Sequence, residues 1–247
     1  MELLTIIFVL FVGLISGFIG SMVGGGGLIS IPLLMFFGLP PQVAIATNKF
    51  GSLGFSVGSI IRFWKGKKII WKYVFPLSLL GVFGGFFGAN LLLNIDEELI
   101  TKIVAVILLM LLPLILIKKD LGVKGKKITK TKKYIGYFVY FFVMIFGGFF
   151  GGGAGFLIIY SLVFFLGLTI IEVNATDAIP WLIQTIIALF IFISAGLVNF
   201  YYGISLLIGM LIGSYIGAHT AIKKGDKWIK SIFVIIILFA ALKFLFF

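Results

Sequence analysis

The chain has 247 residues, of which 62% are hydrophobic and 11% are charged, and its net charge is +12. Soluble domains carry about a quarter charged residues, so this composition excludes a water-soluble globular fold and predicts a chain of membrane-spanning helices. The absence of cysteine excludes disulfides and thiolate metal sites. Glu2 stands where a secretory signal would carry basic residues, and the first apolar run is too long for such a signal, so we expect no cleaved leader.

Apolar runs follow one another along the whole chain, and each predicts a helix. They cover about residues 3–23, 28–39, 43–63, 73–93, 99–117, 134–152, 155–168, 173–194, 200–221 and 229–246. The runs 28–39 and 155–168 are short for a hydrocarbon core that needs about 20 helical residues. Whether these two segments span the membrane or turn back as re-entrant segments stays open.

Basic residues between the runs indicate how the chain is oriented. Seventeen of the 20 Lys and Arg fall in three stretches, with five in 62–72, eight in 118–133 and four in 223–230. The positive-inside rule places these stretches in the cytoplasm, and the acidic loop 94–98 and the uncharged loop 194–200 on the other side. We prefer this explanation of the positive charge to specific binding of nucleic acid or lipid.

The second half of the chain repeats the first at an offset of 129 residues. Ala46-Thr47 corresponds to Ala175-Thr176, and Gly38-Leu39 to Gly167-Leu168. A sustained offset marks an internal repeat. Equivalent loops differ in charge, and each repeat has five runs, so we predict inverted repeats with both termini outside. The predicted fold is an all-α polytopic membrane protein with an N-terminal repeat (1–117), a basic cytoplasmic loop (118–133) and a C-terminal repeat (134–247).

Each repeat is interrupted by glycines just before its short second segment. Glycine costs about 0.8–1.0 kcal/mol relative to alanine inside a helix, so a run of glycines ends one helix and lets another begin. A helix start presents free amide N–H groups and the positive end of a dipole, which suits an anion. We therefore predict that substrate binds at Gly24, Gly25, Gly26, Gly27, Gly151, Gly152, Gly153 and Gly155. Close helix packing explains the scattered glycines of 81–88 and 209–217.

A few polar and ionisable residues lie at membrane depth, where such residues mark functional sites. We predict substrate contacts from Thr47, Asn48, Lys49, Thr176 and Asp177. Lys49 and Asp177 lie at equivalent depths, and we expect them to form an ion pair at rest. The alternative is that Lys49 extends to the membrane surface. Asp177 and His219 are the candidates for proton coupling, although His219 is also compatible with a solvated or packed histidine.

Two related motifs resemble a known family. The glycine run, the proline-containing short segment and the sequence GLPPQVAIATN, together with its echo GLTIIEVNATD, are similar to the TauE/SafE family of sulfite exporter-type membrane transporters. The resemblance covers nearly the whole chain. It implies a multi-pass protein of the plasma membrane that transports a sulfur-containing oxyanion such as sulfite, a sulfonate or thiosulfate.

The sequence carries no P-loop, no metal-ligand cluster and no nucleophile beside a base. We therefore expect neither an enzyme nor an ATP-driven pump, and no cofactor. The favoured function is secondary transport of a small anion by alternating access at a site between the repeats. A channel-like pore or a non-transporting scaffold is the alternative. The expected partners are the anion and the lipid bilayer but not nucleic acid, while a coupling proton and a homodimer stay open.

Overall fold

The structure, a computed structural model, describes residues 2–96, 99, 122–123, 125–229 and 231–232. Every regular element in these residues is a helix, which confirms the all-α prediction. The helices are α1 (Glu2–Val23), α2 (Gly27–Phe36), α3 (Pro41–Lys65), α4 (Trp71–Leu93), α6 (Lys130–Phe149), α7 (Ala154–Leu166), α8 (Ile170–Ser194) and α9 (Phe200–Lys224). The expected helices 99–117 and 229–246 fall almost entirely outside the described residues, as does the boundary at 117.

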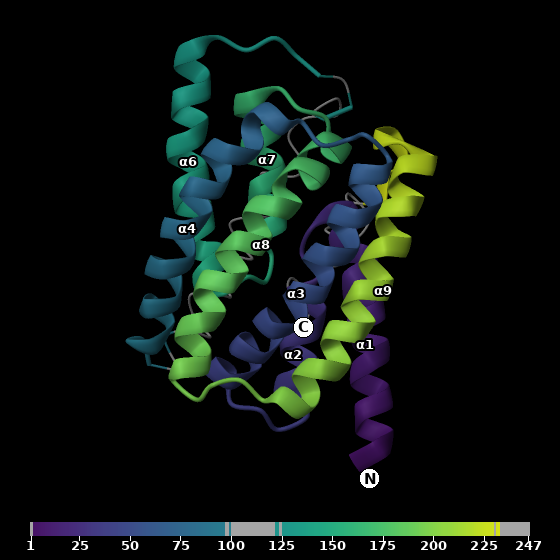
Figure 1. The fold of residues 1–247 in the computed structure, drawn as a ribbon, viewed down its shortest axis with the longest axis vertical. Helices are drawn as coiled ribbons and strands as arrows, with labels where there is room; N and C mark the ends of the chain where they lie inside the picture. Colours follow the sequence, from purple (N-terminus) through teal and green to yellow (C-terminus); the bar gives the residue numbers. More distant parts are fainter. Residues whose placement is uncertain (1, 97–98, 100–121, 124, 230, 233–247) are drawn as a thin grey trace, which may run out of the picture.

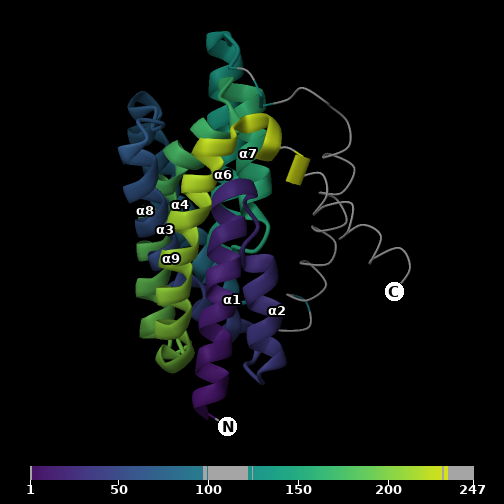
Figure 2. The ribbon, with the colours of Figure 1, turned by 90° about the vertical axis from the view of Figure 1, so that its right-hand side faces the viewer.

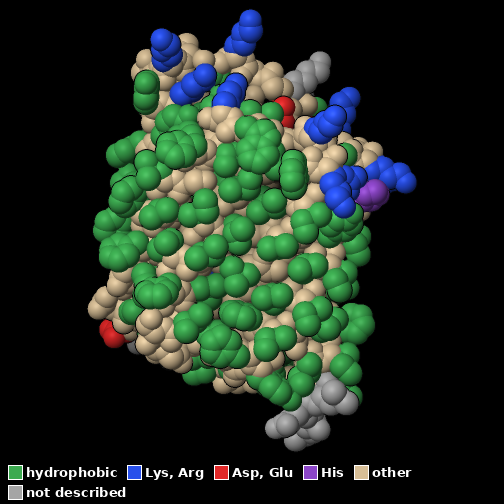
Figure 3. Space-filling view, viewed as in Figure 1, with side chains coloured by type: hydrophobic (Ala, Val, Ile, Leu, Met, Phe, Trp, Pro, Cys, Tyr) green, Lys and Arg blue, Asp and Glu red, His purple; other side chains and the backbone are tan. Residues whose placement is uncertain are grey.

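Four of the helices are long and apolar enough to cross a membrane, namely Leu4–Val23, Trp71–Leu93, Ile170–Ser194 and Phe200–Lys224. Hydrophobic side chains cover the flank of the molecule, and the Lys and Arg side chains gather at one end (Figure 3). We call this the basic end. The turns after α4 and α8 lie at the opposite end, where α1 also begins (Figure 1). The chain is therefore a membrane protein.

Helices α2 and α7 are too short to cross a bilayer. They have 10 and 13 residues, which makes them about 15 and 20 Å long, against a hydrocarbon core of about 30 Å. Helix α2 runs back toward the end where α1 begins, and α7 runs back toward the basic end where α6 begins (Figures 1 and 2). The pairs α1–α2 and α6–α7 are thus hairpins that turn inside the protein.

The long helices pack in pairs that leave no room for side chains at the crossings. Helix α1 lies along α9, and α4 lies along α6. Helix α3 contacts α9, α8 contacts α4, and α3 and α8 contact each other. A Cβ added at Gly209 would lie 2.2 Å from the carbonyl oxygen of Leu10, and one at Gly88 would lie 2.2 Å from that of Ile145. These contacts confirm the packing explanation of the scattered glycines.

The start of α8 is fixed at the basic end by three hydrogen bonds. Thr169 and Glu172 form a capping box, in which the Thr169 N–H donates to Glu172 Oε2 at 2.9 Å and the Glu172 N–H donates to Thr169 Oγ1 at 3.3 Å. The carboxylate of Asp226, beyond the end of α9, accepts from the Ile171 N–H at 2.8 Å. Burial raises the pKa of Asp226, and the bond from Ile171 offsets part of that rise. These caps satisfy amides that the helix itself leaves unpaired.

Candidate functional site

Two glycine turns, one from each half of the chain, touch each other inside the protein. The turn between α1 and α2 packs against the turn between α6 and α7. A Cβ added at Gly24 would lie 2.6 Å from the carbonyl carbon of Gly155, and one at Gly27 would lie 3.0 Å from Cα of Gly152. Gly24 and Gly153 have φ of 77° and 78°, a conformation that glycine adopts at little cost. Only glycine therefore allows both turns to keep this shape and this contact.

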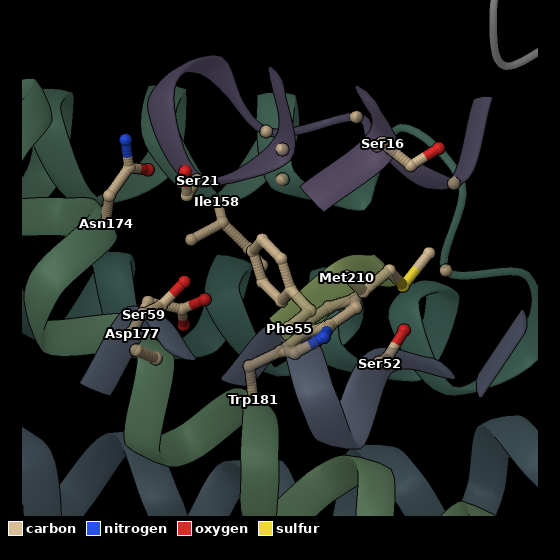
Figure 4. A pocket seen from close by; sticks show the side chains of 18 of the residues that line it. Ser16, Ser21, Ser52, Phe55, Ser59, Ile158, Asn174, Asp177, Trp181 and Met210 are labelled. Atoms are coloured by element: carbon tan, nitrogen blue, oxygen red, sulfur yellow. The ribbon is translucent and has the colours of Figure 1, made fainter. Parts of the chain in front are cut away.

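A pocket of about 70 Å³ lies beside the two turns (Figure 4). A single water needs about 10–15 Å³ of such space, so the pocket has room for a small ion. Residues 24–27, Gly151 and Gly155 line it, whereas Gly152 and Gly153 do not. Its other polar lining comes from both halves of the chain, through Ser16, Ser21, Asn48, Ser52, Ser59, Asn174 and Asp177.

The pocket extends from the glycine turns toward the basic end. Phe63, in the last turn of α3, and Asn174, near the start of α8, both line it. Toward the opposite end, Ile31, Leu92 and Phe192 belong to a buried apolar cluster formed by the other ends of the helices. A second buried apolar cluster, which includes Phe63, Ile69 and Ala221, packs at the basic end, so apolar side chains lie beyond the pocket in both directions along the bundle.

Two serine hydroxyls in the pocket wall have no hydrogen-bond partner within the described part of the chain. Ser16 and Ser59 are each 1% exposed, their Oγ atoms are unpaired, and both line the pocket (Figure 4). Buried polar groups are almost always hydrogen-bonded, because leaving one unpaired costs about 1–3 kcal/mol. These hydroxyls are therefore available to bind a ligand.

Asn48 and Asp177 occupy equivalent positions in the two halves and both line the pocket. Ser30 Oγ donates to Asn48 Oδ1 at 2.5 Å, and the Asn48 amide nitrogen is 3.3 Å from the Cβ position of Gly27. The amide N–H groups of Asn48 are thus turned toward the glycine turn. Asp177 forms a short hydrogen bond with the hydroxyl of Tyr140, which is fully buried in α6.

Lys49 lies behind the pocket wall and makes no ion pair with Asp177, so the predicted pair is wrong. Its Nζ donates to the Gly147 carbonyl at 2.7 Å and to Gln184 Oε1 at 2.8 Å, and lies 4.4 Å from the centre of the Trp181 ring. Helices α3 and α8 run in opposite directions (Figure 1). Lys49 therefore lies beside Trp181 and Gln184, one and two turns after Asp177. Lys49 is 2% exposed, so the alternative of an extended, surface-seeking side chain is also wrong.

The buried ammonium group is instead stabilised by uncharged oxygens. Gly147 belongs to the last turn of α6, where the helix dipole favours a positive charge. Gln184 is fully buried, and its Nε2 donates to the Met144 carbonyl at 3.0 Å. Lys49 and Gln184 together therefore join α3, α6 and α8.

Gln184 and Tyr140 are site residues that the sequence reasoning missed. Gln184 carries a usable signal, since it is an amide at membrane depth two turns after Asp177. Tyr140 carries none, because α6 is rich in aromatic residues and several of them, such as Phe138 and Phe142, face outward.

Thr47 and Thr176 lie outside the pocket lining and bond to the starts of other helices. The Thr47 hydroxyl accepts from the N–H of Asn199, the residue that caps α9, at 3.0 Å. The Thr176 hydroxyl accepts from the N–H of Ile70, the residue that caps α4, also at 3.0 Å. Each threonine thus joins its own half of the chain to the other half, and the donors share the same offset of 129 residues as the acceptors.

His219 lies on the exposed surface near the basic end, where its Nδ1 accepts from Arg62 Nε at 3.0 Å. It does not line the pocket. Among the residues that the structure describes, no group of His, Asp and Glu is placed to hold a metal ion.

Comparison with known proteins identifies the family of the chain. Residues 9–244 match the family described as "Sulfite exporter TauE/SafE". The chain is similar to a "Probable membrane transporter protein" of Haemophilus influenzae, with 26% identity over 95% of this chain and 91% of that protein. It is also similar to the "Probable membrane transporter protein YfcA" of Escherichia coli K12, with 28% identity over 92% of this chain and 84% of that protein. No solved structure matches.

Proposed function

We propose that this chain, which belongs to the sulfite exporter TauE/SafE family, is a secondary transporter that moves a small anion across the plasma membrane by alternating access. The observation that carries this proposal is the meeting of two glycine turns, one from each half, beside a polar pocket. Helices that break inside the membrane and present their starts to a shared site are typical of substrate sites in secondary transporters.

The charges around the pocket favour an anion. Helices α2 and α7 both begin at the glycine turns, so their free amides and positive dipole ends lie close to the pocket. The Lys49 ammonium is 3.7 Å from the Cβ position of Gly151, which lines the pocket. The family description, "Sulfite exporter TauE/SafE", supports a sulfur-containing oxyanion, and we propose sulfite, a sulfonate or thiosulfate.

Asp177 is the one carboxylate that the described residues contribute to the pocket lining, and its negative charge would repel such a substrate. We propose that Asp177 takes up a proton when the anion binds. Proton coupling then follows from the need to keep two negative charges out of a small pocket with few counter-charges.

The helix pairs support two inverted repeats, 1–117 and 134–247, joined by the cytoplasmic loop 118–133. Helices α1, α3 and α4 of the first half correspond to α6, α8 and α9 of the second. The contact α1–α9 therefore corresponds to α6–α4, and the contact α3–α9 to α8–α4, and all four contacts are present. The hydrogen bonds of Thr47 and Thr176 exchange in the same way. A channel is less consistent with the structure than a carrier, because an apolar cluster lies between the pocket and the opposite end.

The test is counterflow in proteoliposomes. Vesicles loaded with unlabelled sulfite should accumulate labelled sulfite in a saturable way, and empty vesicles should not. Gly25 has φ of 74°, and its Cβ would lie 2.5 Å from the Phe156 ring, so Gly25→Leu should abolish counterflow. Gly38→Asn is the matched control, since Gly38 has φ of 87° in open space and asparagine tolerates this conformation. Uptake that is unsaturable and independent of internal substrate would indicate a pore instead.

A further inference from the structure

A second cleft, separate from the glycine pocket, opens at the basic end. It has a volume of about 520 Å³ and lies between the starts of α4 and α6, the turn from α7 to α8 and the segment 125–128. The Lys126 N–H donates to the Gly167 carbonyl at 2.8 Å, which holds that segment against the turn. The cleft is therefore formed by parts of the chain that are far apart in sequence.

Positive charge converges on this cleft. Its lining includes Lys72, Lys126, Lys127 and Lys133, and these lysines form no ion pair in the described part of the chain. Among the described residues, Glu172 is the only acid in the lining, and its carboxylate is used in the capping box of α8.

Two of these ammonium groups approach the same aromatic ring. Lys72 Nζ lies 4.8 Å and Lys133 Nζ lies 6.0 Å from the centre of the Tyr73 ring. Like charges repel when they are brought together, so this arrangement favours an anion between them.

The cleft borders the part of the surface that faces lipid. Trp71 and Tyr134, beside the cleft lysines, are 59% and 71% exposed, and Phe75 and Phe138, one turn further into the bilayer, are 79% and 66% exposed. Tryptophan and tyrosine mark the level of the lipid headgroups. In Figure 3 the Lys and Arg side chains as a group lie at the end above the hydrophobic flank.

We propose that this cleft binds the phosphate of an anionic phospholipid in the cytoplasmic leaflet. The positive-inside rule accounts for basic residues in the loops, but it does not require four of them to converge on one cleft. Basic pockets beside membrane helices bind phosphate-bearing headgroups through such charges. A soluble phosphate has the same chemistry, but the exposed aromatic residues at the rim favour a ligand that has acyl chains.

The test is lipid binding to the full chain in detergent, measured by native mass spectrometry with phosphatidylglycerol and with phosphatidylcholine. Wild-type protein should bind phosphatidylglycerol at least about tenfold more tightly. Each lysine near an anionic headgroup contributes about fivefold in affinity, so Lys72→Gln with Lys133→Gln should weaken phosphatidylglycerol binding about 25-fold. Lys223→Gln with Lys224→Gln is the matched control, with the same charge change at the same end but outside the cleft; its affinity should stay within about twofold of wild type.

Two results would overturn the proposal. If both double variants lose phosphatidylglycerol affinity equally, the loss comes from general surface charge and not from the cleft. Inorganic phosphate that binds wild type as tightly as phosphatidylglycerol does, and loses affinity in the cleft variant, would assign the cleft to a soluble anion. If the Lys72/Lys133 variant fails to fold, Lys126→Gln with Lys127→Gln probes the same cleft from its loop and should show the same loss.

Discussion

Replacing Gln184 with methionine should destabilise the protein because it leaves the Lys49 charge with one oxygen partner instead of two. In the native structure Lys49 Nζ bonds to the Gln184 side chain at 2.8 Å and to the Gly147 carbonyl at 2.7 Å. A hydrogen bond to a charged group contributes about 1.5–3 kcal/mol, and loss of one partner leaves the other group buried and unsatisfied. Methionine has a similar volume, so we expect little cavity cost and a loss of about 2–3 kcal/mol.

The double variant separates this interaction from general damage to the core. Lys49→Met removes the charge. The double variant should therefore lose less stability than the sum of the two single losses, by about 2 kcal/mol. The assay is the free energy of unfolding from denaturing-detergent titrations in mixed micelles. Thr169→Ala is the control partner for Lys49→Met, since Thr169 lies fifteen residues, or about 22 Å, before Gln184 along α8. Additive effects of the Lys49 and Gln184 changes within about 0.5 kcal/mol would show that the two side chains do not interact.

Three further predictions address topology, the glycine turns and pH. The chain has no native cysteine, so Lys126→Cys should resist an impermeant maleimide added outside intact cells; labelling from outside would contradict the inverted topology. Replacing Gly25 and Gly26 with leucine should abolish transport while the protein still inserts, as judged by its yield in the membrane fraction; full transport would reduce the glycines to packing elements. Burial raises the pKa of Asp226, so its contribution to stability is present below the ordinary pKa of aspartate and is lost as the pH rises through the raised value. Asp226→Asn should flatten this part of the Tm–pH curve above about pH 4, the ordinary pKa of aspartate; an unchanged curve would show that Asp226 does not cause it.

The sequence was sufficient to predict the eight helices that the structure describes, because membrane helices require apolar runs and leave the charged residues to the loops. It also located the glycine turns, since a run of glycine can serve only positions where the backbone needs unusual angles or close approach. From the sequence, whether the runs 28–39 and 155–168 span the membrane stays open, because run length alone does not show which way a segment travels. The backbone path, with α2 returning toward the start of α1 and α7 toward the start of α6, favours re-entrant segments.

The partners of the polar residues were not predictable in the same way. Lys49 bonds to Gln184, which is 135 residues away in sequence, and to the carbonyl of Gly147, which has no side chain to signal it. The expected pair with Asp177 rested on equal depth in the two repeats. Side-chain reach across a helix crossing decides such pairs, and it depends on crossing angle and rotation about the helix axis, neither of which composition or spacing specifies.

The bonds made by Thr47 and Thr176 have a consequence for how the protein is made. The hydrogen-bond donor to Thr47, the N–H of Asn199, lies 152 residues later in the chain. Helix α1 likewise lies along α9, which is near the end of the chain. The first half can therefore enter the bilayer early but cannot reach its final contacts until the second half has been synthesised and inserted. Assembly then resembles the joining of two subunits, each of which completes the helix starts of the other, more than the steady growth of one domain from its N-terminus.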